Sequence, residues 1–143
     1  MSKAIVFFII LSAMTFSVVW PSSCNSQPRP RENENVHFRL VQAFLCEEVR
    51  EGIPINQAIV FSVSSGTICC YTMFDEIEQD TVIYHQWLSR DRESTKFRLS
   101  LKDPRWATFS SIQLREGDKG PWQVKIMDSN GRILKTLRFS VVE

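Results

Sequence analysis

The most regular feature of the chain is a two-residue alternation of apolar and polar side chains in its C-terminal half. In KFRLSLK, every second residue is apolar: Phe97, Leu99 and Leu101. The same pattern recurs in WQVKIM, residues 122–127, and in LRFSVV, residues 137–142. Because successive side chains of a β-strand point to opposite faces, this period predicts strands with one face buried and the other in solvent.

Turn signals separate further segments of this kind at short intervals, so that about seven strands are predicted from Ala58 onward: AIVFSV, TICCYTMF, TVIYHQWL, WATFSSIQL and the three above. In WATFSSIQL the alternation slips near Ser110 and Ser111, which predicts a bulge. Short strands at regular spacing are typical of a sandwich or barrel, and Trp87 favours a sandwich core. We predict an all-β fold, an immunoglobulin-like antiparallel β-sandwich of about seven strands after an N-terminal signal or anchor helix.

Residues 36–49, VHFRLVQAFLCEEV, fit two patterns. Phe38, Val41 and Leu45 have the spacing of a helical stripe, whereas Phe38, Leu40, Phe44 and Cys46 partly fit a strand. We choose the strand, because Cys46 is expected to meet another cysteine in a sheet.

The first residues of the chain form a separate region. Lys3 precedes an uncharged apolar run over residues 4–20, and small polar residues follow it. This order is typical of a secretory signal, although the run is also at the short limit for a membrane anchor. Cys24 is in addition a candidate for lipidation. In each case the remainder of the chain is expected to be exported, either to the periplasm or tethered to the membrane and facing the periplasm or exterior.

Composition then divides the chain into three parts. Residues 25–35, NSQPRPRENEN, contain no apolar side chain and cannot bury enough surface to order themselves. The predicted organisation is a signal peptide or membrane anchor over residues 1–24, a disordered tether over residues 25–35 and the β-sandwich over residues 36–143.

Four cysteines in an exported chain permit a disulfide. Cys69 and Cys70 are adjacent on a predicted strand, so they point to opposite faces and only one of them meets a partner from the domain interior. Cys46 is the natural partner, and we predict a Cys46–Cys70 disulfide. Cys69 is then expected to be a buried thiol.

The formal net charge of +1 gives no overall field for an anionic partner, and no basic run interleaved with aromatic residues suggests nucleic acid. No nucleophile elbow, phosphate loop or zinc motif is present in the sequence. His85, in YHQW, shares a strand face with Trp87, so we interpret it as a neutral core histidine. As a catalytic group it would need a cleft and an acid or hydroxyl within hydrogen-bond distance.

Arg105 and Trp106 form the other candidate binding site. An aromatic ring beside a guanidinium, followed by the hydroxyls of Thr108, Ser110 and Ser111, is suited to a sugar or a peptide. The alternative is that Trp106 packs at the edge of the sandwich and Arg105 stacks on a ring or pairs with an acid. Neither this site nor His85 suggests a metal or a cofactor.

Several of these motifs occur together: CEEVREGIPINQAIVFS, CCYTMF, YHQW, RWATFSS and GPWQVKIMDSNGRIL followed by RFSV. Together, over roughly residues 40–142, they resemble the domain-of-unknown-function family 2914. The family pattern places its second cysteine before an aromatic residue and Thr, which corresponds to Cys70 and supports the predicted pairing. Cys69 departs from that pattern. The resemblance implies a small β-sandwich outside the cytoplasm and no established activity.

These observations favour an exported, non-catalytic β-sandwich module that binds a protein or a cell-envelope glycan, with Arg105, Trp106 and His85 as candidate ligand-binding residues. A purely structural or assembly role in an envelope complex is the first alternative, and a hydrolytic enzyme using His85 is the second. We expect no cofactor, no nucleic-acid partner, and contact with a membrane only through the N-terminal segment.

Overall fold

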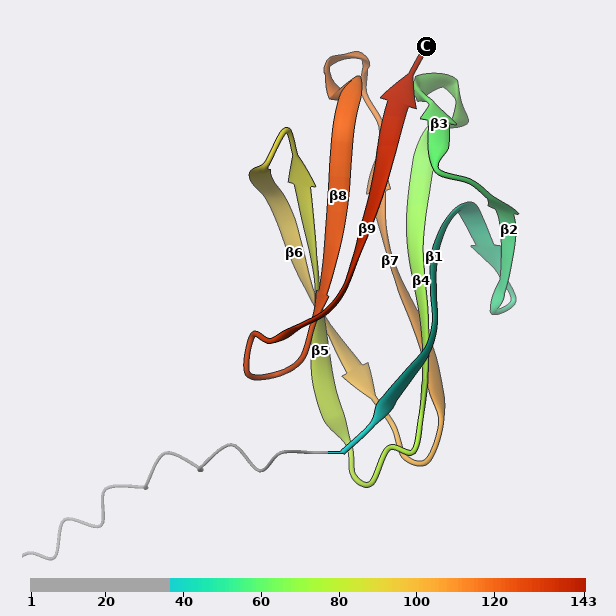
Figure 1. The fold of residues 1–143 in the computed structure, drawn as a ribbon. Helices are drawn as coiled ribbons and strands as arrows, with labels where there is room; N and C mark the ends of the chain where they lie inside the picture. The colour runs from blue at the N-terminus through green and yellow to red at the C-terminus, as the bar shows by residue number, and fades with distance from the viewer. Residues whose placement is uncertain (1–36) are drawn as a thin grey trace, which may run out of the picture. The chain divides into compact units, whose positions relative to one another are not determined.

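Nine β-strands make up most of the described part of the protein (Figure 1). The computed structural model describes residues 37–143, which lie within one compact unit; the predicted leader, Cys24 and the tether lie outside the described residues. The strands are β1 (Arg39–Arg50), β2 (Ile53–Gln57), β3 (Val60–Ser62), β4 (Thr67–Asp75), β5 (Thr81–Ser89), β6 (Arg92–Leu101), β7 (Trp106–Gln113), β8 (Gly120–Met127) and β9 (Ile133–Val142). Residues 37–143 contain no helix long and apolar enough to cross a membrane.

The strands form two sheets that pack as a sandwich, which confirms the predicted all-β class (Figure 1). One sheet has the order β2-β1-β4-β7 and the other the order β3-β9-β8-β5-β6. The expected strand over residues 36–49 is present as β1. The prediction of a fully antiparallel sandwich was wrong for one pair of strands, because β3 pairs with β9 in parallel. The strand number was also too low, since β2 was not predicted.

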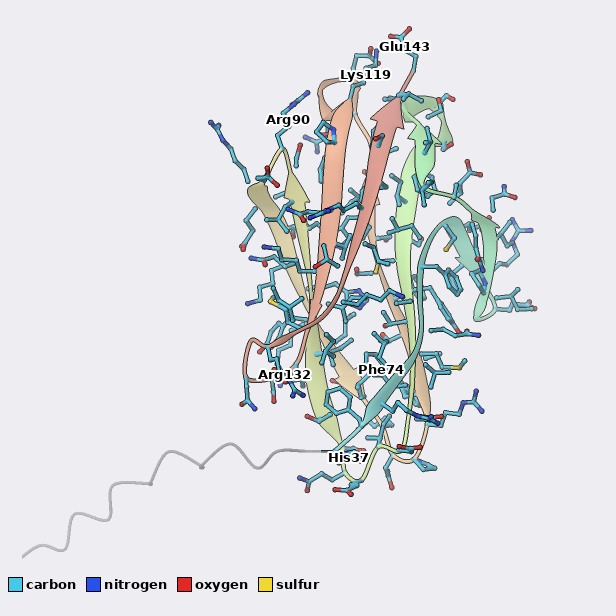
Figure 2. All side chains as sticks on the ribbon, viewed as in Figure 1. His37, Phe74, Arg90, Lys119, Arg132 and Glu143 are labelled. Carbon is cyan, nitrogen blue, oxygen red and sulfur yellow. The ribbon has the colours of Figure 1, made fainter. Side chains whose placement is uncertain are left out.

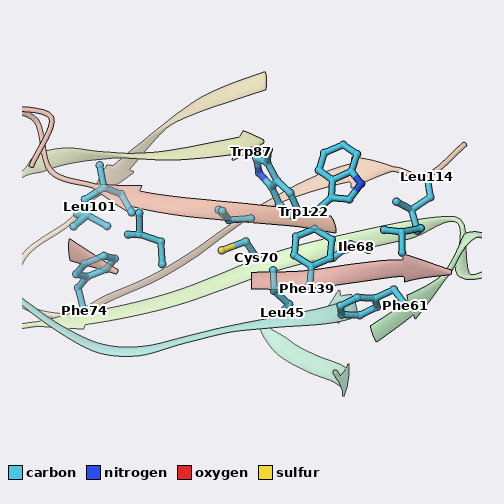
Figure 3. Packing of buried hydrophobic residues seen from close by; sticks show 14 of the residues in the cluster. Leu45, Phe61, Ile68, Cys70, Phe74, Trp87, Leu101, Leu114, Trp122 and Phe139 are labelled. Atoms are coloured by element: carbon cyan, nitrogen blue, oxygen red, sulfur yellow. The ribbon is translucent and has the colours of Figure 1, made fainter. Parts of the chain in front are cut away.

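The core consists of the apolar side chains that alternate inward from both sheets (Figure 3). Phe139 of β9 lies at its centre, with its ring centroid 6.0 Å from that of Trp87 and 6.1 Å from that of Trp122. The ring planes are nearly perpendicular in the first pair and nearly parallel in the second. Both arrangements are favourable for aromatic quadrupoles and add to the burial of the rings.

The predicted Cys46–Cys70 disulfide is not formed, because the two side chains lie on opposite faces of their sheet. In the antiparallel register of β1 and β4, Cys46 is opposite Cys69, and Cys70 is opposite Leu45. Cys70 points into the sandwich core with Leu45 and Trp87 (Figure 3), whereas Cys46 and Cys69 belong to a second buried cluster with Tyr71. All three cysteines are free thiols.

The bulge predicted at Ser110 is also absent. Strand β7 keeps a continuous register with β4 from Trp106 to Gln113. Ser110 occupies a regular inward position and is buried. The apolar–polar alternation is interrupted in the sequence because this inward position holds a polar residue. Its hydroxyl takes part in a buried hydrogen-bond network with His85 and Trp87.

Candidate functional site

His85 lies at the centre of a chain of buried hydrogen bonds that joins the two sheets. Its Nδ1 is 2.9 Å from Oγ of Ser110, and its Nε2 is 3.3 Å from Oγ1 of Thr72. The indole Nε1–H of Trp87 donates to the same Ser110 Oγ at 3.0 Å, and the Thr72 hydroxyl donates to the Thr108 carbonyl at 3.3 Å. One tautomer satisfies every group: Ser110 donates to Nδ1, and Nε2–H donates to Thr72.

This network is closed to solvent. The exposed fraction of His85 is 0%. Burial lowers the pKa of its imidazole to about 4, because the protonated ring would lose its hydration. The Ser110–His85 distance is one that a nucleophile and its base could have, but the pair opens into no cleft. His85 is therefore the neutral core histidine that the sequence indicated, and its place as a ligand-binding residue was wrong.

Arg105 and Trp106 lie at the edge strand β7, away from this network. The Trp106 side chain is 42% exposed, and the Arg105 guanidinium donates to Sδ of Met73 at 3.5 Å. Of the hydroxyls proposed to accompany them, that of Ser110 faces the core. Trp122 on β8 is only 5% exposed. Within residues 37–143, Trp106 is therefore the one indole with a largely exposed ring.

A different site emerges on the outer face of the five-stranded sheet. Four basic side chains point outward there from three strands, and Arg90 lies in the turn after β5, at the end of the sheet. We call these five residues the basic face: Arg90, Lys96, Arg98, Lys125 and Arg138. The alternation that sends apolar residues inward sends these residues outward. Strand pairing then places them in neighbouring rows, since adjacent strands lie about 4.8 Å apart.

Uncharged hydrogen-bonding side chains lie between the cations. Gln86 of β5 is the register partner of both Lys96 and Lys125, so the amide lies between the two ammonium groups. Gln123 is opposite Arg138, and the Nζ of Lys96 lies 4.6 Å from the ring centroid of Tyr84. Cations, amides and one phenol ring thus share a single surface.

The five cations form no ion pair with any residue of the described part. The two acids nearby are already hydrogen-bonded to amides: Asp91 accepts from Gln123 at 2.8 Å, and Glu93 accepts from Gln86. Like charges held on one face repel one another at low ionic strength. This repulsion would be relieved by an anionic ligand.

A groove of about 380 Å³ lies at one end of the basic face, beside Arg90 and Arg138. Arg90 is held in place, since its backbone N–H donates to the Pro121 carbonyl at 3.0 Å and its guanidinium donates to the Lys119 carbonyl. Figure 2 shows Arg90 and Lys119 at the same end of the sandwich. The groove rim is apolar at Ile59, which is 73% exposed. The groove therefore combines guanidinium donors with an apolar wall.

Sequence reasoning did not find the basic face, although part of the signal was present. Arg98, Lys125 and Arg138 each occupy a polar position within an alternating strand. The net charge of +1 concealed them, because the acids of the chain balance the total charge wherever they lie in the fold. Among residues 37–143, no group of three or more His, Cys, Asp or Glu side chains is placed to hold a metal ion.

Comparison with known proteins gives limited help with function. No curated protein matches the sequence. One solved structure with a similar arrangement is the beta-glucosidase from Listeria innocua in complex with isofagomine, which is 8% identical with a TM-score of 0.39. The match covers 73% of this chain and 16% of that enzyme, and so weak a likeness carries no argument about activity. The family model described as "Protein of unknown function (DUF2914)" matches residues 80–141, which confirms the resemblance found in the sequence motifs.

Proposed function

We propose that this protein is an exported, non-catalytic binding module whose basic face holds an acidic glycan of the cell envelope. One observation carries the proposal: four cations on the outer face of one sheet, and Arg90 at the end of that sheet, form no ion pair with any described residue. A sheet is a stiff platform, so a ligand would bind without much ordering of the protein, which favours affinity.

The side chains between the cations support a glycan rather than a simple anion. Gln86 and Gln123 offer amide groups suited to sugar hydroxyls, and they lie beside the pair formed by Lys96 and the Tyr84 ring. Such mixtures give orientation and specificity to a charged surface. Nucleic acid would prefer exposed rings for base stacking, and the Tyr84 ring is already covered by Lys96.

We also propose that the sandwich is of the immunoglobulin-like type. In antibody domains of that fold, a buried tryptophan of the third strand packs against a disulfide that joins the second strand to the other sheet, and here Cys70 is a free thiol. Trp87 on β5 and Cys70 on β4 belong to the same core cluster here, which supports the assignment. The parallel pairing of the short strand β3 with β9 is an addition to the antiparallel framework.

The structural or assembly role has one observation in its favour. On the other sheet, the rings of Phe44 and Tyr71 are stacked with centroids 5.1 Å apart, and Phe109, the register partner of Tyr71, is 45% exposed. Exposed aromatic side chains of this kind are frequent at protein–protein interfaces. A protein partner on this second face would be compatible with a glycan on the basic face.

The test compares two double variants of the 143-residue chain, solubilised in detergent. Lys96→Gln with Lys125→Gln removes two charges from the basic face, and Arg105→Gln with Lys135→Gln removes two charges elsewhere. The probe is polygalacturonate, with neutral dextran as the uncharged polymer, and Kd is measured by calorimetry at two salt concentrations. Since an exposed ion pair contributes up to about 1 kcal/mol, the first variant should bind about 10-fold more weakly and the control should bind like the wild type.

Equal Kd values for the wild type and the Lys96/Lys125 variant would refute the basic face as the binding site. Loss of binding in the control variant instead would place the ligand outside the basic face, at Arg105 or at Lys135. Binding of dextran as tight as that of polygalacturonate would refute the requirement for an acidic ligand.

A further inference from the structure

Two of the free thiols face each other across the boundary between β1 and β4. Cys46 and Cys69 are register partners, and both are almost completely buried. Directly opposed residues of antiparallel strands have Cα atoms about 4.5–5.5 Å apart. Natural disulfides span Cα separations of about 4.4–6.8 Å, so the backbone already has a suitable spacing.

Hydrogen bonds show that each sulfur reaches toward the opposite strand. The Cys46 Sγ–H donates to the Cys69 carbonyl at 3.9 Å, and the Cys69 Sγ–H donates to the Glu47 carbonyl at 3.8 Å. Both side chains lie in the buried cluster with Tyr71, on the same face of the sheet. Cys70 points to the opposite face of the sheet, where no other cysteine of residues 37–143 lies.

The two thiols also influence each other's proton affinity. The interaction with the Cys46 thiol lowers the pKa of Cys69, while the same interaction and burial raise the pKa of Cys46. Burial raises the pKa of the Cys70 thiol. Since the thiolate is the nucleophile in thiol–disulfide exchange, this interaction favours Cys69 over Cys46 as the attacking sulfur.

We propose that Cys46 and Cys69 form a cross-strand disulfide when the chain meets a disulfide oxidant. The Cys69 thiolate attacks one sulfur of the oxidant, whose S–S bond breaks and releases the first thiolate. The Cys46 thiolate then attacks the Cys69 sulfur of the mixed disulfide and releases the second. Overall, two protein thiols lose two electrons and two protons, and one oxidant disulfide becomes two thiols.

Such a bond would tie the β1–β2 hairpin to the rest of the sandwich. Strand β2 contacts its sheet only through β1, and β1 is held by β4. The bond closes a loop of about 24 residues, which should raise the melting temperature by about 10 °C or more relative to the reduced chain. Because both sulfurs are buried, oxidation should proceed faster in mild denaturant than in buffer.

The experiment treats the reduced 143-residue chain with oxidised glutathione, denatures it without reductant and labels the remaining thiols with N-ethylmaleimide. Trypsin cleaves after Lys and Arg, so Cys46 falls in peptide 40–50 and Cys69 and Cys70 share peptide 51–90. Mass spectrometry should find these two peptides linked, and fragment ions should place the label on Cys70. Label on Cys69 instead, or two unlinked peptides, would overturn the proposal.

Two variants supply a matched comparison. Cys70→Ala removes the neighbouring thiol and should keep both the link and the dependence of the melting temperature on reductant. Cys46→Ala should lose both. If Cys46→Ala still melts at a temperature that falls on reduction, another pair is responsible and the proposal fails. The labelling of the wild-type chain decides the pairing even if Cys70→Ala does not fold.

Discussion

Replacing Ser110 by alanine should destabilise the sandwich far more than the loss of one hydroxyl suggests. The Ser110 Oγ accepts the indole N–H of Trp87 at 3.0 Å and lies 2.9 Å from Nδ1 of His85. Both rings are 0% exposed, so water cannot replace the lost partner. Each buried polar group left without a partner costs about 1–3 kcal/mol, and two such groups give a loss of about 3 kcal/mol.

Ser111→Ala is the matched control, because it makes the same chemical change one residue along the same strand, at an exposed position. The free energy of unfolding should be measured by urea titration followed by tryptophan fluorescence, with the slope m unchanged between variants. Ser111→Ala should stay within about 0.5 kcal/mol of the wild type. If Ser110→Ala is no more destabilising than Ser111→Ala, the network does not stabilise the fold and the reasoning is refuted.

Two further predictions concern the same core. The folded-state pKa of His85 is lowered to about 4, below the unfolded value of 6.5. Between these two pH values the unfolded chain binds a proton at His85 that the folded chain does not. The contribution of His85 to the free energy of unfolding is therefore complete above pH 6.5 and is lost as the pH falls toward 4. A His85→Gln variant should therefore lose less stability than the wild type between these two pH values, and parallel urea-derived curves would contradict the assignment. Trp87→Ala should destabilise by about 3–5 kcal/mol, since a fully buried indole is removed, and a smaller value in the same titration would mean that the core collapses around the gap.

Strand alternation is a local property, and the sequence therefore predicted it correctly. Phe97, Leu99 and Leu101 point inward on β6 because a strand has a period of two, whatever its neighbours are. Ser110 shows the limit of this reasoning. A polar residue at an inward position interrupts the apolar–polar alternation, so the sequence alone suggested a bulge. The position is explained only by the hydrogen bonds of Ser110 with His85 and Trp87, which are distant in sequence.

The sequence by itself determined most of the strands, the alternation of their apolar faces and the family resemblance. Only the tertiary structure decided the pairing of strands, and with it the chemistry of the surface. A shift of one residue in the register of two strands would bring the side chains of the other face toward the core. The observed register places Cys46 opposite Cys69 and not opposite Cys70. In the same way, Lys96, Lys125 and Arg138 meet on one face because β6, β5, β8 and β9 are neighbours, and this order depends on contacts between distant parts of the chain.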